Sequence, residues 1–523
     1  MKINILSLQT FFLAMMSVII GCSKGTVAQP PAPVTVASHS PIVPVIKGLT
    51  ANPTLRIAIH IPSGHTGKTF KTIRGTLNAT AIPAIQRIDL YLTGAEPFTT
   101  ANRIASLQPT ATAFDLPVDL KLPSGVHFLW LSVVLKDEAS IDGRIDLRCT
   151  SLTDAAGKNI LVSHDLTETA KRIGVAVRKA GDDKVNTYRI PGIVTTDKGT
   201  LLAVYDIRYI NSTDLPGNID VGLSRSTDGG RTWSPMRIIM DMGAPHENNG
   251  VGDPAILFDP VTRKIWVAAL WSKGNRSIAG SLPGMSPDTT GQYALVSSDD
   301  DGVTWTTPYT ITPQVKNPAW HLFFVGPGNG IAMQDGTLVF SSQYWDEKKM
   351  PHSTIIHSKD NGRTWTGKIL GPKSNTTESQ VVETSPGSLM LNMRDNRGGF
   401  RSVATTSDLG GQWTEHPTSY SALPDPVCMA SLIKARVTSE GASKDVLFFS
   451  NPNTSSGRYN MTVKASLDMG QTWQPVHQLL VDQRTGYGYS SLTRIDEQTI
   501  GLLYEGVKDL YFVRIPVNEI LKK

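Results

Sequence analysis

The sequence predicts an all-β protein, a six-bladed β-propeller preceded by a small β-sandwich domain. The main observation is a turn motif, Ser-x-Asp-x-Gly-x-Thr-Trp, which occurs four times and once more in a weaker copy. The copies lie about 60 residues apart on average, a period typical of propeller blades. Between them, short segments alternate apolar and polar residues as strands do. The chain of 523 residues also contains 45 Gly and 33 Pro, as a protein with many turns requires.

The repeated motif has a structural role in this interpretation. Asp and Ser side chains bond to nearby backbone in turns, Gly takes a positive φ at little cost, and Trp brings a large apolar surface to the core. We therefore expect each motif to hold a hairpin together and to carry no chemistry. About 350 residues lie between the N-terminal domain and the C-terminus, enough for six blades, one of them without a motif. The motifs begin at Ser226, Ser298, Ser358, Thr406 (the weaker copy) and Ser466.

The first 22 residues have the features of a bacterial targeting segment. Lys2 precedes an apolar run over residues 5–20, and Ile19-Ile20-Gly21-Cys22 resembles a lipobox. A lipobox predicts cleavage before Cys22 and acylation of its thiol, which would anchor the protein to a membrane of the cell envelope. The alternative is an ordinary secretory signal with an incidental cysteine. Both interpretations predict export from the cytoplasm.

Two segments separate the targeting segment from the propeller. Residues 23–44 contain five prolines among small residues and are expected to form an extended linker. Residues 45–166 contain alternating strand patterns, such as residues 87–92, and predict the β-sandwich. A carbohydrate-binding module and a spacer compete as its role, and the absence of a recognisable aromatic platform favours the spacer. Residues 172–523 are assigned to the propeller.

Charge and cysteine usage exclude several classes of protein. The net charge is +5 without a long Lys/Arg run, so no nucleic-acid partner is expected. Besides Cys22, only Cys149 and Cys428 are present. They fall in different predicted domains, and we expect two buried thiols rather than a disulfide between them. No His or Cys spacing indicates a metal site, and no cofactor is expected.

The repeats resemble the Asp-boxes of exo-α-sialidases, especially those of Bacteroidetes. Tyr188-Arg189-Ile190-Pro191-Gly192 is similar to the Arg-Ile-Pro signature at the start of the propeller in that family. The resemblance covers about residue 172 to the C-terminus and, more loosely, the domain before it. It implies hydrolysis of terminal α-linked sialic acid from glycoproteins, glycolipids and oligosaccharides.

The resemblance implies that Arg189, Arg394 and Arg458 bind the substrate carboxylate. Sialic acid carries a carboxylate on its anomeric carbon, and Arg binds carboxylates bidentately without losing its charge. Clustered cations repel one another, so three arginines in one cleft make sense as an anion site. The structural alternative is three unrelated surface arginines.

Tyr489, in Gly486-Tyr487-Gly488-Tyr489-Ser490, matches the family's nucleophile, and the following Ser-x-Leu pattern selects it over Tyr487. Sialidases are the glycosidases that use tyrosine in place of a carboxylate. A carboxylate nucleophile about 4 Å from the substrate carboxylate would meet a repulsion of about 4 kcal/mol. A phenol avoids this repulsion, but its pKa near ~10 means that it needs a base beside it.

Glu378 is identified as that base, because it precedes the second arginine by the family's spacing. Glu383 is the alternative, and we assign it a structural role. Asp214 is identified as the acid/base residue, on a loop where an apolar, partly closed site would raise its pKa. Asp206 and Asp220 compete with it; the first is expected to pair locally and the second to begin a strand.

Three further residues follow by the same resemblance. Arg208 is expected to line the pocket, Asp253 to contact a ring hydroxyl or the N-acetyl region, and Glu505 to orient Arg189 by a salt bridge. The alternative function from another class is a propeller that binds sialic acid without catalysis. A nearer alternative is an enzyme that transfers sialic acid to another sugar or releases it in anhydro form.

Overall fold

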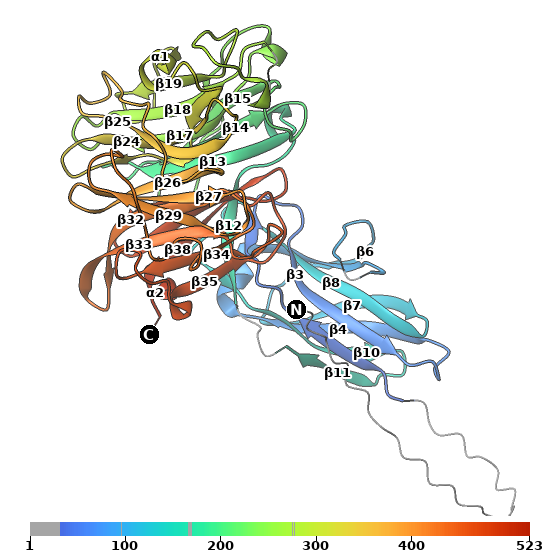
Figure 1. Ribbon diagram of the computed structural model, residues 1–523. Helices are drawn as coiled ribbons and strands as arrows, with labels where there is room; N and C mark the ends of the chain where they lie inside the picture. Colours follow the sequence, from blue (N-terminus) through green and yellow to red (C-terminus); the bar gives the residue numbers. More distant parts are fainter. Residues whose placement is uncertain (1–31, 96, 166–169, 275, 277, 523) are drawn as a thin grey trace, which may run out of the picture.

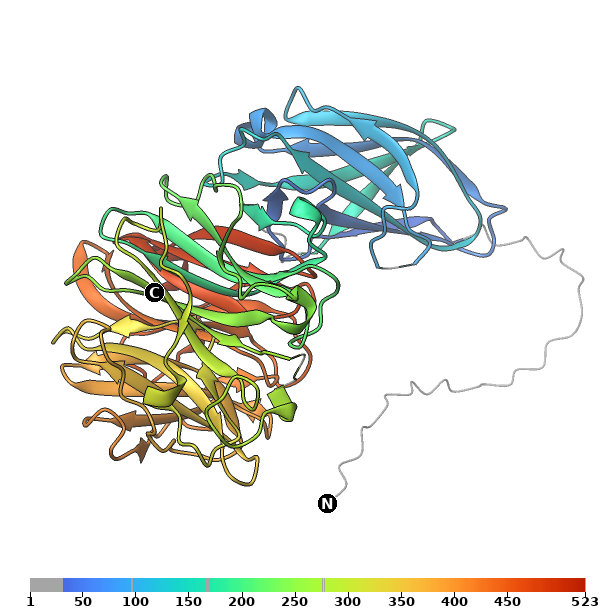
Figure 2. The same ribbon diagram turned by 90° about the horizontal axis from the view of Figure 1, so that it is seen from above.

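The computed structural model describes residues 32–95, 97–165, 170–274, 276 and 278–522. It contains an N-terminal β domain and a six-bladed propeller that lie side by side (Figure 1), so the predicted fold class is confirmed. Figure 2 shows the N-terminal domain against one side of the propeller. The helices are all short, and almost all elements of the described chain are β-strands.

The N-terminal domain is one continuous sheet of nine strands, in the order β6-β5-β8-β3-β1-β11-β10-β4-β7. β11 joins its two halves, because it pairs in parallel with β1 and antiparallel with β10. Inward side chains from both halves share a core that includes Leu55, Phe70 and Leu116. The domain therefore has two layers, as a sandwich does, which are continuous through β11. Its elements are β1 (Thr35–His39), β3 (Pro53–Ile61), β4 (Lys68–Leu77), η1 (Ala79–Ala84), β5 (Ile85–Leu92), β6 (Arg103–Leu107), β7 (Ala113–Leu122), β8 (Gly125–Leu135), β10 (Leu147–Asp154) and β11 (Asn159–His164).

The prediction of an extended linker over residues 23–44 is wrong for the second half of that range. β1 lies inside it and pairs with β3, where Val36 faces Ile59. Val43 is also buried. The prolines suggested an extended, solvated segment, but the valines between them supply enough apolar surface to join the core. Only residues from 32 onward are described, so Cys22 and the whole targeting segment lie outside the described part of the chain.

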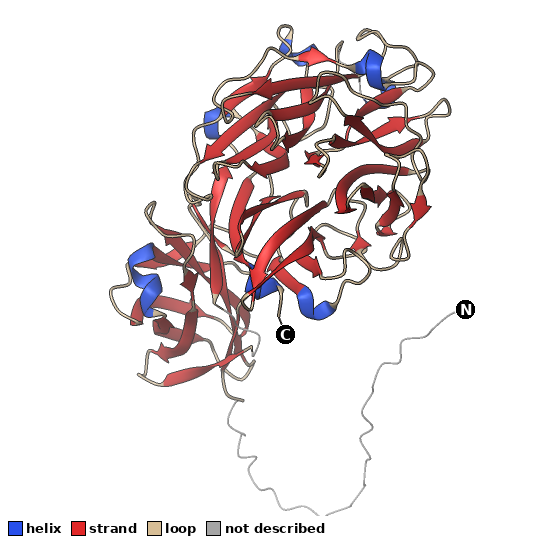
Figure 3. Cartoon of the chain, turned by 90° about the vertical axis from the view of Figure 1, so that its left-hand side faces the viewer, coloured by secondary structure: helices blue, strands red, loops and turns tan. Residues whose placement is uncertain are grey.

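The propeller consists of six antiparallel blades arranged in a ring (Figure 3). In five blades the strands follow one another outward in chain order, except that β21 and β23 of the third blade both pair with β24. Short pieces complete the sheets: β22 (Gly328–Asn329) pairs with β17, and β28 (Gly399–Phe400) pairs with β31 (Pro424–Asp425). The blades are β13 (Thr187–Thr195), β14 (Leu201–Arg208), β15 (Ile219–Ser226) and β16 (Arg237–Met240); β17 (Val251–Phe258), β18 (Ile265–Trp271), β19 (Gln292–Ser298) and β20 (Tyr309–Thr310); β21 (Leu322–Val325), β23 (Ile331–Ala332), β24 (Leu338–Trp345) and β25 (Pro351–Ser358); β26 (Thr376–Ser385), β27 (Ser388–Asp395), β29 (Ser402–Thr406) and β30 (Thr414–Glu415); β32 (Ser431–Ser439), β33 (Ala442–Pro452), β34 (Met461–Ser466) and β35 (Gln478–Asp482); and β36 (Ser490–Asp496), β37 (Thr499–Glu505), β38 (Leu510–Pro516) and β12 (Lys171–Arg178).

The sixth blade closes the ring with strands from both ends of the propeller sequence. β12, which precedes the first blade, pairs antiparallel with β38, where Val175 faces Phe512. β2 (Val45–Lys47) and β9 (Arg144–Ile145), from the N-terminal region, also pair with β12. The N-terminal domain is therefore attached to the propeller by backbone hydrogen bonds. The short helical turns are η2 (Asp182–Lys184), η3 (His246–Asn248), η4 (Ile278–Gly280), α1 (Thr312–Val315), η5 (Pro475–His477) and α2 (Val517–Ile520).

Each repeated motif follows the third strand of its blade, or β25 in the third blade, and folds into the same turn, as expected. In the second copy, Asp300 Oδ1 accepts hydrogen bonds from the backbone N–H of Thr304 (2.7 Å) and Val303 (3.1 Å), and Oδ2 accepts from the Thr304 hydroxyl (2.6 Å). These bonds, led by that from the hydroxyl, lower the pKa of Asp300 to about 2. The carboxylate is therefore committed to the turn. The sixth blade has no motif, as the spacing predicted.

The tryptophans of the motifs are less buried than expected. Trp365 is buried in the core, whereas the other four are half-buried. Trp233 packs edge-to-face on Phe512, with the ring centroids 5.2 Å apart. Since Phe512 belongs to the sixth blade, the Trp233 ring packs in the interface between two blades and not in the core of a single blade. The four half-buried side chains are Trp233, Trp305, Trp413 and Trp473.

The glycine of each motif lets the turn approach the preceding blade. Gly362 has φ +79°, and a Cβ there would lie 2.2 Å from the Trp266 ring. Gly230 and Gly302 likewise have positive φ and would meet Phe512 and Leu202. A side chain at these positions would both strain the backbone and push two blades apart.

The first prediction compares two glycines with nearly the same backbone conformation. Gly336 has φ +85°, but a Cβ there would lie 3.7 Å from Val261, an ordinary contact. We expect Gly336→Ala to lower the free energy of unfolding by about 1 kcal/mol and Gly362→Ala by about 2–4 kcal/mol, because the latter adds a clash. Urea denaturation measures both. Equal losses would contradict the role of the glycine in packing the blades.

Candidate active site

A cavity of about 240 Å³ lies where the six blades converge at one end of the ring. Every blade contributes to it, which explains why its residues are spread over most of the propeller sequence. Its lining combines acids, arginines, amides and a few apolar side chains. The lining residues are Arg189, Ile190, Asp214, Asp253, Ile278, Phe324, Gln343, Trp345, Thr377, Glu378, Arg394, Asn396, Arg458 and Tyr489.

Tyr489 and Glu378 meet at the floor of this cavity. Tyr489 Oη donates a hydrogen bond to Glu378 Oε1, although the two residues come from the sixth and fourth blades. Arg394 Nη1 donates to Glu378 Oε2 (2.6 Å) and to Tyr489 Oη (3.0 Å). Burial and then the charge of Glu378 raise the pKa of Tyr489 well above its ordinary value, against the opposing charge of Arg394. The phenol is therefore protonated and donates its proton in a hydrogen bond to a carboxylate.

Tyr487 has a different environment, although it lies in the same run. Its carbonyl accepts a hydrogen bond from Arg458 Nη1 at 2.9 Å. Its ring lies under the Arg189 guanidinium, 4.8 Å from Cζ. The structure thus brings Tyr489, and not Tyr487, to Glu378.

The three predicted arginines surround the Tyr489 ring. The guanidinium carbons of Arg189 and Arg458 lie 5.2 and 5.5 Å from its centroid, and Arg394 contacts its hydroxyl. Among the described residues, Nε of Arg394 is buried without a hydrogen-bond partner. Such a cluster of cations with an unsatisfied donor favours a bound anion. The alternative of three unrelated surface arginines does not fit this arrangement.

Glu505 lies directly beneath the cavity and is fully buried. Its Oε1 accepts from Arg189 Nε (3.1 Å) and from the Ile190 backbone N–H (2.9 Å). Its Oε2 accepts from the Tyr489 backbone N–H at 2.9 Å. One carboxylate thus orients an arginine, as expected, and also fixes the backbone of the tyrosine.

Asp214 lies on the loop between β14 and β15 at the cavity rim, with 63% of its side chain exposed. Partial burial would raise its pKa, but the charges of Arg208 and Arg189 outweigh burial and lower it below the ordinary value. Asp214 Oδ1 lies 2.8 Å from Arg208 Nη1 and 3.4 Å from Arg189 Nη1. The expected rise in the pKa of Asp214 is therefore not found, because the loop places the carboxyl against two cations.

Arg208 does not line the cavity, contrary to expectation. It is 1% exposed and donates to Asp206 Oδ2 through Nε (3.1 Å) and Nη2 (2.8 Å). It therefore lies one layer below Asp214 and supports it. The two competing acids are both engaged elsewhere: Asp206 pairs locally with Arg208, as expected, and Asp220 accepts a hydrogen bond from Tyr209 Oη at 2.9 Å.

Asp253 lines the cavity in a strained conformation, with φ +56°. Its backbone N–H donates to Asp206 Oδ1 at 2.8 Å. Burial, followed by the negative charges of Asp206 and Asp214, raises its pKa well above the ordinary value. A carboxyl that keeps its proton can donate a hydrogen bond to a ligand hydroxyl or carbonyl.

Glu383 is remote from this chemistry. It accepts hydrogen bonds from the backbone N–H groups of Gly387 (2.9 Å) and Gln334 (2.8 Å) and so fixes two turns. It lines a different cavity, which also contains Val194 and Asn329. The assignment of Glu383 to a structural role agrees with this position.

Sequence reasoning missed seven lining residues, which are scattered over the first four blades. Ile190 adjoins Arg189, Thr377 adjoins Glu378 and Asn396 lies two residues after Arg394, so proximity in sequence could have suggested these three. No spacing pattern points to the other four. The seven are Ile190, Ile278, Phe324, Gln343, Trp345, Thr377 and Asn396.

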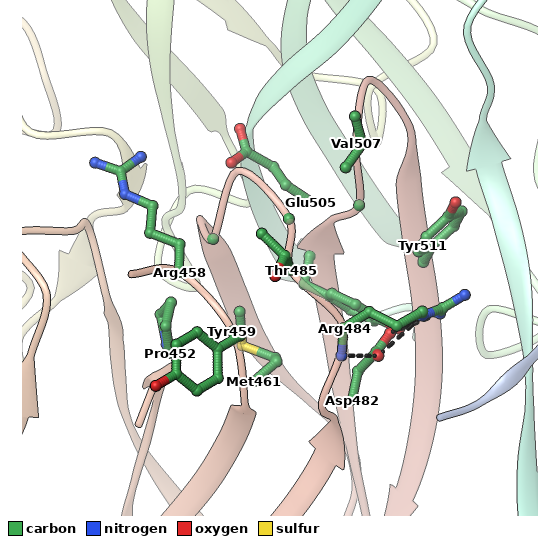
Figure 4. A pocket seen from close by; sticks show the side chains of 14 residues that line it. Pro452, Arg458, Tyr459, Met461, Asp482, Arg484, Thr485, Glu505, Val507 and Tyr511 are labelled. Atoms are coloured by element: carbon green, nitrogen blue, oxygen red, sulfur yellow. Dashed lines mark hydrogen bonds and ion pairs between the residues drawn. The ribbon is translucent and has the colours of Figure 1, made fainter. Parts of the chain in front are cut away.

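A second, smaller cavity of about 160 Å³ lies behind Arg458, between the fifth and sixth blades (Figure 4). It holds the ion pair of Arg484 and Asp482, with Nη2 and Oδ2 2.6 Å apart. In Figure 4 the Arg458 guanidinium points away from this pair. Arg458 lines both cavities, so its stem separates them.

In the described part of the chain, no group of three or more His, Cys, Asp or Glu side chains is arranged to hold a metal ion. No helix there has the length and apolar character needed to cross a bilayer. Cys149 and Cys428 are both buried, in different domains, and are not joined in a disulfide, as expected.

Comparisons with known proteins agree with the fold. Residues 199–503 match the family model of the BNR repeat-like domain, and residues 34–158 match that of the N-terminal domain of BNR-repeat neuraminidase. A sialidase of Bacteroides fragilis is 49% identical over 412 residues, covering 77% of this chain and 76% of that protein. A sialidase of Micromonospora viridifaciens is 36% identical over 62% of this chain and 50% of its own length.

A solved structure extends the likeness to nearly the whole chain. The Hadza microbial sialidase Hz136 is 40% identical, with a TM-score of 0.86, over 93% of this chain and 100% of its own. These matches, together with the site, make the protein a glycoside hydrolase. Within that class, the chain belongs to the BNR-repeat sialidase family.

The second prediction separates the two acids of β26. We expect Glu378→Gln to lower kcat for a sialoside by a hundredfold or more, because a positioned base typically contributes a factor of ~10²–10⁴. Glu383→Gln is the matched control on the same strand; it should keep kcat within about twofold and lower only the melting temperature, because it loosens two turns. The reverse pattern of losses would show that the two acids are exchanged.

Proposed function

We propose that the protein is a retaining exo-α-sialidase that releases terminal α-linked sialic acid from glycoproteins, glycolipids and oligosaccharides with Tyr489 as nucleophile. The observation that carries this proposal is the hydrogen bond from Tyr489 Oη to Glu378 inside a ring of arginines. A phenol next to a base is the form in which a tyrosine becomes a nucleophile. The family relationship supports the substrate class.

The arginines supply the position of the substrate. Arg189, Arg394 and Arg458 would hold the carboxylate that sialic acid carries on its anomeric carbon. Because all three contact or face the Tyr489 ring, a carboxylate held among them brings the attached anomeric carbon toward the phenol oxygen. Asp253, protonated and at the cavity wall, would donate to a polar group of the sugar.

In the first displacement, Tyr489 Oη attacks the anomeric carbon and its proton passes to Glu378. The bond from the anomeric carbon to the glycosidic oxygen breaks, and that oxygen takes the proton of Asp214. Asp214 by itself is poorly suited to this, because Arg208 and Arg189 lower its pKa. A bound substrate carboxylate offsets the charge of Arg189, so binding raises the pKa of Asp214 toward the range of a general acid.

The second displacement reverses these roles. Asp214, now a carboxylate, removes a proton from water, and the oxygen of that water attacks the anomeric carbon. The bond to Tyr489 Oη breaks, and Glu378 returns its proton to the phenol. Two inversions at one carbon leave the product with the configuration of the substrate. The exposure of Asp214 at the rim gives water a route to the intermediate.

The third prediction tests both the stereochemistry and the nucleophile. Proton NMR of sialoside hydrolysis should show the α-anomer of free sialic acid first, followed by mutarotation. Tyr489→Phe should lower kcat by about a thousandfold or more while leaving the melting temperature nearly unchanged, because only the hydroxyl is removed. Tyr487→Phe is the control and should turn over the substrate nearly as well as the unchanged protein.

Other results would favour the alternatives. Binding of the sialoside without release of any sugar would indicate a sialic-acid-binding propeller. Release of an anhydro sugar, or transfer to an added acceptor sugar in place of water, would indicate that water is excluded from the intermediate. First appearance of the β-anomer would contradict the retaining mechanism.

We also propose that the protein is exported and anchored in the cell envelope by acylation of Cys22. The lipobox-like sequence supports this. β1 begins at Thr35, so about 12 residues separate the anchor from the folded domain. Fully extended, these residues span about 40 Å at most. The site would therefore act close to the membrane surface, on glycans that reach it.

The fourth prediction concerns this anchor. Metabolic labelling with a radioactive fatty acid should label the unchanged protein and Cys149→Ala, and both should sediment with membranes. Cys22→Ala should carry no label and should appear in the soluble fraction, because an acyl chain supplies the membrane affinity. Identical behaviour of the Cys22 and Cys149 variants would instead indicate an ordinary secretory signal.

A further inference from the structure

Arg401 is a completely buried arginine at the junction of the fourth and fifth blades. It lies between β28 and β29, and all three of its guanidinium nitrogens donate hydrogen bonds. Nε and Nη2 bond to Asn392, at Oδ1 (2.7 Å) and at the carbonyl O (3.2 Å). Nη1 bonds to the Cys428 carbonyl (2.6 Å) and lies 3.4 Å from Asp425 Oδ2. One side chain thus connects two segments that both reach the active site.

The first segment carries Arg394. Asn392 precedes it by two residues on β27, and in a strand residues two apart point to the same face. Arg401 donates hydrogen bonds to both the side chain and the carbonyl of Asn392, and so it fixes the position of β27. Arg394 extends from the same strand to Glu378 and Tyr489. A displacement of β27 would move this arginine relative to the phenol.

The second segment is the turn over residues 425–428. Asp425 Oδ1 accepts from the Cys428 N–H at 2.9 Å, and Arg401 holds the Cys428 carbonyl, so both polar groups of that residue are fixed. Between them Val427 has φ +58°, a conformation that β-branched residues rarely adopt. In this conformation its carbonyl accepts a hydrogen bond from Arg458 Nη2 at 3.0 Å.

The same turn also supports the nucleophile. The Cys428 side chain packs in a small buried cluster with Ile190, Met429 and Tyr489. The turn therefore contacts the tyrosine through its side chains and a substrate-binding arginine through its backbone. Asn451, from the fifth blade, also holds this turn in place, because it donates hydrogen bonds to Asp425 Oδ2 (3.3 Å) and to the Pro424 carbonyl (2.8 Å).

We propose that Arg401 and Asp425 are positioning residues, which set Arg394, Arg458 and Tyr489 in register for the substrate carboxylate. The proposal rests on the proposed function, because it assumes that these arginines bind that carboxylate. Replacing a buried ion pair by apolar residues is often neutral or stabilising. Stability alone is therefore a poor reason for the buried pair of Arg401 and Asp425. Their hydrogen bonds instead go to Asn392 and Cys428, which lie next to the groups of the site.

The fifth prediction uses the difference in affinity between sialic acid and its methyl ester, which lacks the carboxylate charge. Both are measured as competitive inhibitors of the full chain, with a sialoside as reporter substrate. We expect the unchanged protein to prefer the acid by tenfold or more. Arg401→Lys, which cannot bond to Asn392 and Cys428 together, should weaken acid binding about tenfold and leave ester binding nearly unchanged.

A matched control is available in Arg172, another buried arginine. Its Nη1 donates to the Arg514 carbonyl (2.8 Å) and its Nη2 to Glu519 (2.6 Å), far from the cavity lining. Arg172→Lys should lower the melting temperature but keep the preference for the acid. Asp425→Asn, which preserves the shape of the side chain, should reduce the preference for the acid about threefold. This second variant tests the positioning role if Arg401→Lys does not fold.

The outcomes separate the two proposals. If the unchanged protein binds the acid and the ester equally, the proposal that the arginines bind the substrate carboxylate is wrong. If it prefers the acid, and folded Arg401→Lys or Asp425→Asn keeps the full preference and an unchanged KM, the positioning role is overturned. Equal weakening of acid and ester would also overturn it, because that result indicates a general loss of structure.

Discussion

The buried carboxylate of Glu505 is the interaction on which the site and the closure of the ring both depend. It stands at the end of β37 in the last blade, yet it accepts hydrogen bonds from Arg189 and Ile190 in the first. It also accepts from the backbone of Tyr489. Removing one partner of such a buried pair typically costs about 3–5 kcal/mol, because the other charge is left uncompensated. The same carboxylate thus connects the last blade to the first and holds Arg189 next to Tyr489.

Three residues with positive φ lie beside the groups of the cavity. Ile190, Asp253 and Val427 have φ values of 57°, 56° and 58°. Ile190 and Val427 are β-branched, and such residues rarely adopt this conformation. Each of the three adjoins a group of the site: Ile190 follows Arg189, Asp253 lines the cavity and Val427 presents its carbonyl to Arg458. The turns of the repeats also contain residues with positive φ, such as Gly302 and Leu409, but none of these is β-branched.

The arginines of the site favour a ligand that brings a negative charge. Arg208 and Arg189 lower the pKa of Asp214, while burial and neighbouring acids raise that of Asp253. A carboxylate bound among the arginines changes the balance at Asp214 toward its protonated form. Half of the residues that line the cavity could be predicted from short motifs, because each lies within a recognisable local pattern. The lowered pKa of Asp214 and the burial of Arg208 could not, because they depend on how one loop folds over one strand.

The sequence by itself determined the number of blades and the family. The repeats are local, so their turn chemistry and spacing are legible without any knowledge of packing. Only the tertiary structure decided which acid of β26 meets Tyr489, that β1 belongs to the N-terminal core, and that Arg401 connects two arms of the site. These facts arise from contacts between blades far apart in the chain, and side-chain pairing across such distances leaves no periodic trace in a single sequence.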